Sequence, residues 1–239
     1  MEIKRFFAPQ SALSNNLITI TGDEFYHLSK VLRHKIGYKI IVSLEDGKDY
    51  YCTITKMEKD SCEAIVDDVK DNPCISDVKI TLFQAIPKGS KIDLIIQKTT
   101  ELGVDEIVPF YSKYTNEKKF NIERNKKIAV EASKQSGRAK ITKIRDVISF
   151  EDMLDMLLKF DLVIMPYEHS TEGRIGDIKK LKTAKNIAYI IGSEGGFDAL
   201  EVQKAQEKGA KIVTLGKTIL RVETAAIVAL AIIKYELGY

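Results

Sequence analysis

Tryptophan is absent from the 239 residues, and histidine and cysteine occur only three times each. Cys52, Cys62 and Cys74 form no CxxC pair, and no two histidines have the spacing of metal ligands. Neither a metal site nor a disulfide framework is therefore expected. No GxSxG nucleophile elbow is present either, so the sequence predicts no triad chemistry. These absences agree with a function whose chemistry is supplied by a bound cofactor.

Long apolar runs are also missing. The longest, residues 225–233, is far shorter than the roughly 20 residues that a membrane-spanning helix needs. Residues 1–9 contain charges and no extended apolar stretch, so they do not have the pattern of a secretory signal. With 44% apolar and 30% charged residues, a globular protein with no membrane partner is expected, and a cytoplasmic location is the default expectation.

Positive charge is in small excess and unevenly distributed. The net charge is +3, but residues 1–72 carry ten basic and twelve acidic side chains, against 27 and 22 in the rest of the chain. Residues 118–140 alone carry eight basic side chains and two acidic ones. Such a local stripe is typical of a surface that contacts a polyanion. A solvated helix face has the same pattern, and charge alone does not separate the two.

The first 70 residues are predicted to form a small β-barrel. Apolar and β-branched residues alternate or cluster in the manner of strands over residues 38–44, 48–57 and 61–69. Asp46-Gly47 is a turn signal between the first two. Thr21 and Glu24 have the spacing of a capping box and predict one helix, whose apolar face would carry Phe25, Leu28 and Leu32. Several short strands with one helix favour a barrel.

A short polar linker at residues 71–73 precedes a segment in which apolar strands alternate with helices. The expected strands cover residues 78–86, 106–110, 161–165, 186–191 and 211–215. The expected helices cover residues 90–102, 122–137, 150–158, 199–208 and 224–237. This alternation predicts an α/β fold, with a mostly parallel sheet covered by helices on both faces.

Three of these strands end in unusual loops, at residues 165–168, 191–197 and 215–221. Because the carboxyl ends of parallel strands lie at one edge of a sheet, the loops are expected to line one pocket. The second loop has three glycines in five residues, which allows the backbone to approach a ligand closely. A tight turn that uses glycine for steric reasons alone has the same pattern. Asp198 and Glu201 then predict the capped start of a helix.

Two motifs in these loops are incomplete. Gly216-Lys217-Thr218 looks like the end of a phosphate-binding loop, but the full motif needs glycine where this chain has Lys211. The glycine-rich loop departs from GxGxxG because Glu194 takes the place of the second glycine. A nucleotide-hydrolysing enzyme is therefore not favoured.

Four segments, in order along nearly the whole chain, resemble the RsmE family of SPOUT methyltransferases. They are Phe25–Leu28 with Val31–Arg33, KTTELGVDEIVP at residues 98–109, Glu131–Arg138, and the highly specific pair IGSEGGF (191–197) and LGKTILRVETA (215–225). The resemblance implies a PUA-like RNA-binding β-barrel at residues 1–70. It also implies a SPOUT-type α/β domain at residues 74–239, with a parallel sheet and a C-terminal trefoil knot.

The resemblance further implies the activity. Members of the family methylate N3 of a uridine in 16S ribosomal RNA, so S-adenosylmethionine is the expected cofactor, and 16S RNA or the 30S subunit is the expected partner. A homodimer is implied as well. The cofactor is expected to bind in a bent form against the three loops, through Met165, Pro166, Ile191, Gly192, Glu194, Gly195, Gly196, Leu215, Gly216, Ile219 and Leu220.

The polar groups expected nearest the chemistry are Arg221, Glu194 and Glu223. Arg221 is expected to stabilise negative charge that develops on the uracil, and one of the two glutamates to accept the N3 proton directly or through water. A structural ion pair between Arg221 and Glu223 at the start of a helix is the alternative.

Seven basic residues are expected to contact RNA phosphates: Arg5, Arg33, Lys35, Lys88, Lys91, Arg124 and Arg138. The chain departs from the family at Ser193 and near Thr142, where proline is usual, and near Lys91 and Lys113, where arginine is usual. Lysine keeps the charge but lacks the planar fork of arginine. Two alternatives stay open: a SPOUT enzyme that acts on ribose 2′-OH or on transfer RNA, and a non-catalytic RNA-binding factor of ribosome assembly.

Overall fold

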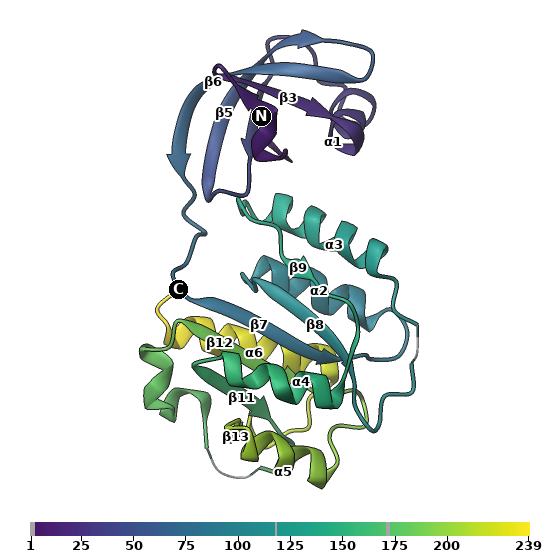
Figure 1. Cartoon of the computed structure of the whole chain (residues 1–239), viewed down its shortest axis with the longest axis vertical. Coiled ribbons are helices and arrows are strands. Elements are labelled where there is room, and N and C mark those ends of the chain that lie inside the picture. Colours follow the sequence, from purple (N-terminus) through teal and green to yellow (C-terminus); the bar gives the residue numbers. More distant parts are fainter. Residues whose placement is uncertain (1–2, 118, 171–172) are drawn as a thin grey trace. The chain divides into compact units, whose positions relative to one another are not determined.

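The computed structural model describes residues 3–117, 119–170 and 173–239 (Figure 1). The chain divides into two compact units. The first comprises residues 1–75 and 133–141, and the second comprises residues 76–132 and 142–239. The boundary therefore falls within helix α3 (Ile122–Gln135), a division that no local sequence pattern indicated.

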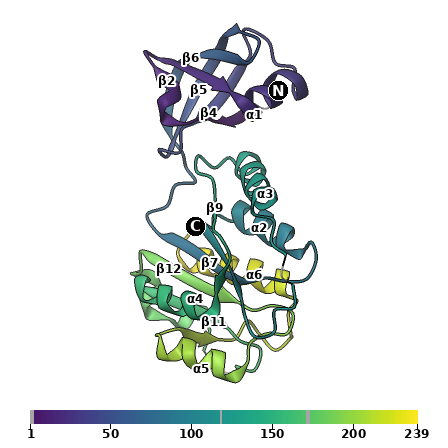
Figure 2. The same ribbon diagram turned by 45° about the vertical axis from the view of Figure 1, so that its right-hand side comes forward.

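The N-terminal unit contains one six-stranded sheet in the order β1-β4-β5-β6-β3-β2. Among the described residues, only the pair β1–β4 is parallel, and Figure 2 shows how strongly the sheet curves. Its core is apolar and includes Phe6, Ile18, Ile40 and Ile54, all fully buried. The strands are β1 (Lys4–Phe7), β2 (Leu13–Ser14), β3 (Leu17–Thr21), β4 (Lys39–Ser43), β5 (Lys48–Met57) and β6 (Ser61–Asp71).

The predicted helix exists, but its predicted capping box does not. Helix α1 (Gly22–Tyr26) continues as a π-helical turn over His27–Val31, and the side chain of Thr21 makes no capping hydrogen bond. Glu24 instead forms an ion pair with Lys134, at 2.7 Å between Oε1 and Nζ. The predicted capping box was therefore wrong, and the Glu24 carboxylate contacts a residue far away in the chain.

The C-terminal unit contains a seven-stranded sheet in the order β10-β8-β7-β12-β11-β13, with β9 paired to β8. Every strand pair in it is parallel among the described residues, as predicted. The strands are β7 (Lys79–Ala85), β8 (Glu106–Tyr111), β9 (Lys143–Ile144), β10 (Ile148–Ser149), β11 (Leu162–Pro166), β12 (Asn186–Ile191) and β13 (Lys211–Val213).

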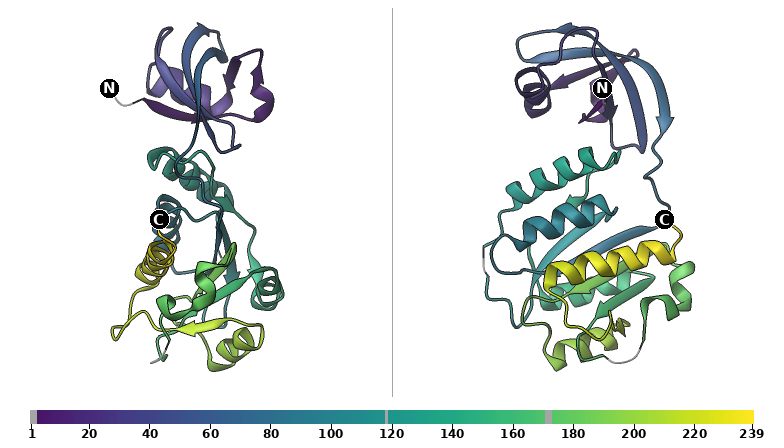
Figure 3. Two further views of the ribbon diagram at one scale, coloured as in Figure 1. Left: turned by 90° about the vertical axis from the view of Figure 1, so that its left-hand side faces the viewer. Right: turned by 180° about the vertical axis from the view of Figure 1, so that it is seen from behind.

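Helices cover both faces of this sheet (Figures 1 and 3). Helices α4 (Phe150–Met156) and α5 (Ala199–Glu207) pack on one face, where Phe83, Phe110 and Met165 belong to the core. Helices α2 (Lys91–Glu101) and α6 (Val222–Glu236) pack together on the other. None of the described helices is long and apolar enough to cross a bilayer. Both faces being covered explains why the strands are apolar throughout instead of alternating.

Candidate cofactor pocket

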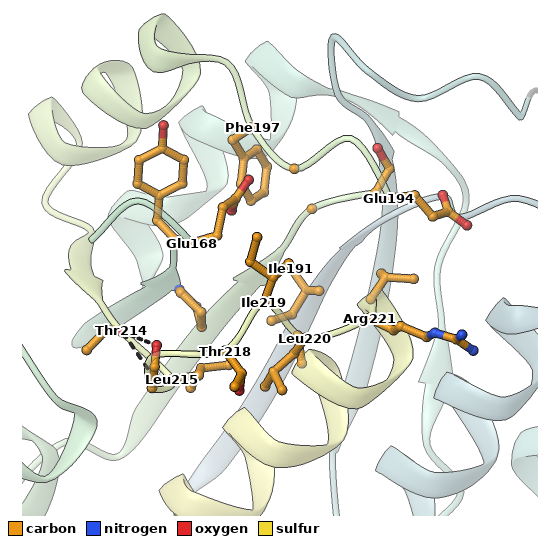
Figure 4. Close-up of a pocket in the computed structure, with 18 of the residues that line it drawn as sticks. Glu168, Ile191, Glu194, Phe197, Thr214, Leu215, Thr218, Ile219, Leu220 and Arg221 are labelled. Carbon is orange, nitrogen blue, oxygen red and sulfur yellow. Dashed lines mark hydrogen bonds between the residues drawn. The ribbon is translucent and has the colours of Figure 1, made fainter. Parts of the chain in front are cut away.

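The three strand-end loops line a single pocket of about 550 Å³, at the carboxyl ends of β11, β12 and β13 (Figure 4). Parallel pairing of these strands brings the loops to the same edge of the sheet, as the sequence predicted. The pocket lies within the size range of sites for small ligands and cofactors. A single edge of the sheet therefore holds the candidate functional site.

The glycine-rich turn, defined here as Gly192–Phe197, owes its shape to two glycines. The N–H of Gly196 donates to the carbonyl of Ser193 at 3.0 Å, and Gly196 has φ +64°, a conformation that disfavours a side chain. A Cβ on Gly196 would also overlap the carboxylate of Glu168. A Cβ on Gly195 would lie 2.7 Å from the Cβ of Tyr114. Helix α5 then begins with the predicted capping box, in which Asp198 accepts from the N–H of Leu200 and Glu201 accepts from that of Asp198.

Most of the residues predicted to contact a cofactor line the pocket, with two exceptions. The side chain of Met165 is buried in the core, because strand alternation directs it toward α4 and α5. Gly195 packs against Tyr114 and is not part of the lining. The prediction also missed several lining residues, which are Tyr167, Glu168, Ser193, Phe197, Thr214, Lys217, Thr218, Val222 and Ala225.

Thr214 was not predicted to line the pocket because strand β13 is shorter than expected. It ends at Val213, two residues before the expected end, so Thr214 belongs to the loop. The hydroxyl of Thr214 accepts from the N–H of Gly216 at 3.1 Å and helps to close the loop. Ile219 in the same loop is 84% exposed, although it is a large apolar residue that lines the pocket. Such exposure is expected of a side chain that a ligand covers.

Glu194 and Lys91 form an ion pair at the pocket, with 2.6 Å between Oε1 and Nζ. The backbone N–H of Lys88 donates to the same carboxylate at 3.0 Å. Partial burial raises the pKa of Glu194, but the hydrogen bonds from Lys91 and from backbone N–H groups outweigh it and lower the pKa. Lys91 therefore lies at the pocket and is paired there, which the sequence could not show because Lys91 and Glu194 are far apart in the chain.

Arg221 and Glu223, the other two residues expected near the reacting atoms, differ in position relative to the pocket. Arg221 precedes α6, is exposed and lines the pocket (Figure 4). Glu223 lies two residues further on, outside the pocket lining, and its Oε2 is buried without a hydrogen-bond partner among the described residues. No ion pair joins Arg221 and Glu223 within that part of the chain. Of these two residues, only Arg221 belongs to the pocket lining, and its guanidinium points outward, away from Ile191 and Leu220 (Figure 4).

Comparison with known proteins shows to which family the chain belongs. Residues 75–234 match the family model of the RNA methyltransferase domain, and residues 20–67 match that of the RNA methyltransferase PUA domain. Ribosomal RNA small subunit methyltransferase E of Bacillus subtilis is 32% identical over 91% of this chain and 90% of its own. The protein of the same name from Rickettsia conorii is 31% identical over 97% and 95%.

The chain belongs to the RsmE family of RNA methyltransferases.

A solved RsmE structure supports the same membership. Ribosomal RNA small subunit methyltransferase E of Neisseria gonorrhoeae, crystallised with S-adenosylmethionine, has a TM-score of 0.82 and 30% identity, with 98% of each chain covered. The mixed α/β fold and the N-terminal PUA domain predicted from the sequence are confirmed by these matches.

The pocket fits the cofactor of this RsmE relative. Ile191, Leu215 and Leu220 contribute apolar side chains to the lining, a slot that would suit a purine ring. Glycine-rich backbone lies beside the slot, where N–H and carbonyl groups can bind ribose and adenine edges. Glu168 places a carboxylate in the lining, suited to the cationic methionine end of S-adenosylmethionine. The size, the apolar slot and the acidic group agree with this ligand.

The residues predicted to contact RNA separate into two groups. Arg33, Lys35, Lys88 and Arg124 are exposed, although Arg124 pairs with Asp93 at 2.6 Å. Lys91 is held at the pocket by Glu194, and Arg138 is only 6% exposed. Arg5 forms a buried ion pair with Asp49 at 2.5 Å. Lys118 of the basic stripe lies outside the described residues. Burial removes Arg5 and Arg138 from the surface that this structure offers to a polyanion.

Proposed function

We propose that this protein transfers the methyl group of S-adenosylmethionine to N3 of a uridine in 16S ribosomal RNA. The observation that carries the proposal is the pocket at the carboxyl ends of β11, β12 and β13, in a chain of the RsmE family. The curated relatives are named as small subunit ribosomal RNA methyltransferases, which supports the RNA substrate. The uridine N3 specificity comes from the resemblance to RsmE.

The residues of the pocket have separate roles in cofactor binding and in methyl transfer. Bound S-adenosylmethionine supplies an electrophilic methyl group on a positively charged sulfur. The glycine-rich turn and the loop at residues 214–221 hold the cofactor, and positioning of this kind removes several kcal/mol of barrier. Arg221 stabilises the negative charge that develops on O2 or O4 when N3 loses its proton.

The N3 proton must leave before or during methyl transfer. Of the two candidate carboxylates, Glu194 is favoured because it lines the pocket, whereas Glu223 does not. Its lowered pKa makes Glu194 a weak base at neutral pH, and it accepts the proton directly or through water. Lys91, beside Glu194, adds positive charge where the anionic uracil would form.

Several features of the family complete the proposal. The N-terminal PUA domain binds RNA, and the C-terminal unit carries the trefoil knot, in which the chain after β13 returns to pack α6 against α2 and β12. The protein works as a homodimer in the cytoplasm, on 16S RNA or the 30S subunit. Arg33, Lys35, Lys88 and Arg124 contact RNA phosphates, since their side chains are exposed.

Methyl transfer from labelled S-adenosylmethionine to 16S RNA, to 30S particles and to bulk transfer RNA tests the proposal. N3-methyluridine in 16S RNA is the expected product. A 2′-O-methylated nucleoside or a methylated transfer RNA would assign the alternative SPOUT activity. Cofactor binding without product from any substrate would favour a non-catalytic assembly factor, and no cofactor binding would overturn the assignment of the pocket.

A further inference from the structure

The segment that follows β8, residues 112–116, is a closed turn. The N–H of Ser112 donates to the hydroxyl of Thr115 at 2.9 Å, and the N–H of Thr115 donates to the carbonyl of Ser112 at 3.0 Å. Reciprocal bonds of this kind hold a loop in one conformation. We call this segment the supporting turn.

Tyr114, at the centre of the supporting turn, lies directly against the glycine-rich turn. Its carbonyl accepts a hydrogen bond from the hydroxyl of Ser193 at 3.1 Å. Its Cβ is so near Gly195 that a methyl group there would lie 2.7 Å away. Neither Tyr114 nor Gly195 lines the pocket, whereas Gly192 and Gly196 on the same turn do. Tyr114 therefore contacts the cofactor-binding turn without reaching the cofactor.

The capping box of α5 adds a second link to the supporting turn. Each of its carboxylates caps the helix with one oxygen and binds the supporting turn with the other. Asp198 Oδ1 accepts from the N–H of Leu200, while Oδ2 accepts from Lys113 Nζ at 2.7 Å and from the Tyr114 hydroxyl at 3.2 Å. Glu201 Oε2 accepts from the N–H of Asp198, while Oε1 accepts from the N–H of Lys113 at 2.8 Å.

These links differ in strength. The Lys113 ammonium is exposed, with 56% of its side chain accessible, so its ion pair with Asp198 contributes little. The bond from the Lys113 N–H ends on Glu201, which is 7% exposed, and survives any change of the Lys113 side chain. Close packing of Tyr114 on Gly195 leaves no room for the turn to move toward it. Beyond the Cβ, the ring of Tyr114 brings Cγ and Cδ2 to 3.2 and 3.6 Å from the same methyl position, and its hydroxyl binds Asp198. The ring is thus the part of this support that truncation to alanine removes, while the Cβ and the backbone bonds stay.

We propose that Tyr114 is a positioning residue that packs against Gly195 and holds the glycine-rich turn in the conformation that receives the cofactor. This inference rests on the proposed binding of S-adenosylmethionine by that turn. A preorganised turn binds more tightly because less conformational entropy is lost on binding. Loss of the support should therefore weaken cofactor binding first.

The test is calorimetric titration of the full chain with S-adenosylmethionine and S-adenosylhomocysteine. Tyr114→Ala is expected to raise both dissociation constants about tenfold, or about 1.4 kcal/mol. Amide hydrogen exchange at Gly195 and Gly196 should accelerate in the same variant. Gly195→Ala should weaken binding in the same direction, because its methyl group displaces the turn from Tyr114 without entering the pocket.

Two controls separate positioning from a general loss of structure. Tyr114→Phe keeps the ring and loses only the hydroxyl bond to Asp198, so its dissociation constants should stay within about threefold of wild type. Tyr111→Ala removes a tyrosine of matched exposure, 39% against 40% for Tyr114, from the end of β8, and should bind as wild type does.

The outcomes are distinguishable. Wild-type affinity in Gly195→Ala, alone or together with Tyr114→Ala, would overturn the positioning role, and the glycine variant decides the matter even where Tyr114→Ala does not fold. Failure of the wild-type chain to bind either ligand would instead overturn the proposed function, and this inference with it.

Discussion

Charged side chains serve different purposes in the two units. In the N-terminal unit, Arg5 and Asp49 are 8% and 6% exposed, and Asn72 donates a further hydrogen bond to Asp49 at 2.9 Å. In the C-terminal unit, Lys91 and Glu194 are 38% and 30% exposed and lie at a pocket. The buried pair is isolated from any ligand and stabilises the fold, whereas the accessible pair can respond to a ligand. Burial, and not residue type, separates the two roles.

The largest effect should follow from breaking the buried pair. Arg5→Met leaves the Asp49 carboxylate buried without its cation and should lower the stability of the N-terminal unit by about 3–5 kcal/mol. Amide hydrogen exchange in β4 and β5 measures that loss. Arg33→Met, at an exposed arginine, is the matched control and should change stability by less than about 0.5 kcal/mol. Equal losses of stability in the two variants would show that the buried ion pair contributes no more to stability than an exposed arginine does.

The stability contributed by the Arg5–Asp49 pair should depend on pH in the acid range. Burial raises the pKa of Asp49, but the hydrogen bonds from Arg5 and Asn72 lower it by more, so the net shift is downward. A lowered pKa stabilises the fold above the ordinary aspartate value of about 3.9 and ceases to do so as pH falls through the folded value. The stability gap between wild type and Arg5→Met should therefore be largest near neutral pH and narrow as acid protonates Asp49 in the two folded proteins, and a gap independent of pH would contradict this account.

At the pocket, Arg221→Ala should lower kcat about 100-fold, or about 2.7 kcal/mol, because it removes a charge that stabilises the anionic uracil. Calorimetric affinity for S-adenosylmethionine should change little, since the side chain acts on the other reactant. Separate measurement of binding and turnover checks this. A wild-type kcat in the variant would show that Arg221 has no catalytic role.

A smaller effect is expected at Glu194. Glu194→Gln should lower kcat about tenfold, below the usual range of general-base effects, because a carboxylate with a lowered pKa is a weak proton acceptor. Glu223→Gln, which changes a carboxylate outside the pocket lining, is the comparison. A larger loss in Glu223→Gln than in Glu194→Gln would transfer the proton-accepting role to Glu223.

The smallest expected effect is on the salt dependence of RNA binding. Arg33→Ala should reduce the slope of log binding constant against log salt by about 0.7–0.9, as expected for one lost phosphate contact. Arg138→Ala, at a residue that is 6% exposed, should leave the slope unchanged. Filter binding of 16S RNA across a salt series gives both slopes. The reverse order would show that Arg138 becomes accessible when RNA binds.

Local sequence patterns determined much of the fold. Alternating strands and helices after residue 74 predicted the parallel sheet, and β5 and β12 run as expected, over Lys48–Met57 and Asn186–Ile191. Of the strands that were missed, β1, β2, β9 and β10 are two to four residues long, too short for hydrophobic periodicity to be recognised. The interior strand β3 (Leu17–Thr21) was also missed, although its residues alternate in burial. The Asp198–Glu201 capping box was also predicted, because both its partners lie within one helical turn.

The sequence by itself therefore determined the succession of elements, the three loops and the family, since each depends on neighbouring residues or on a motif. Only the tertiary structure decided which charges are buried and which contacts support the pocket. Arg5 meets Asp49, Glu194 meets Lys91, and Ser193 meets Tyr114 across 44, 103 and 79 residues of chain. No local periodicity encodes such pairs, because they depend on how sheets and loops pack after the chain has folded.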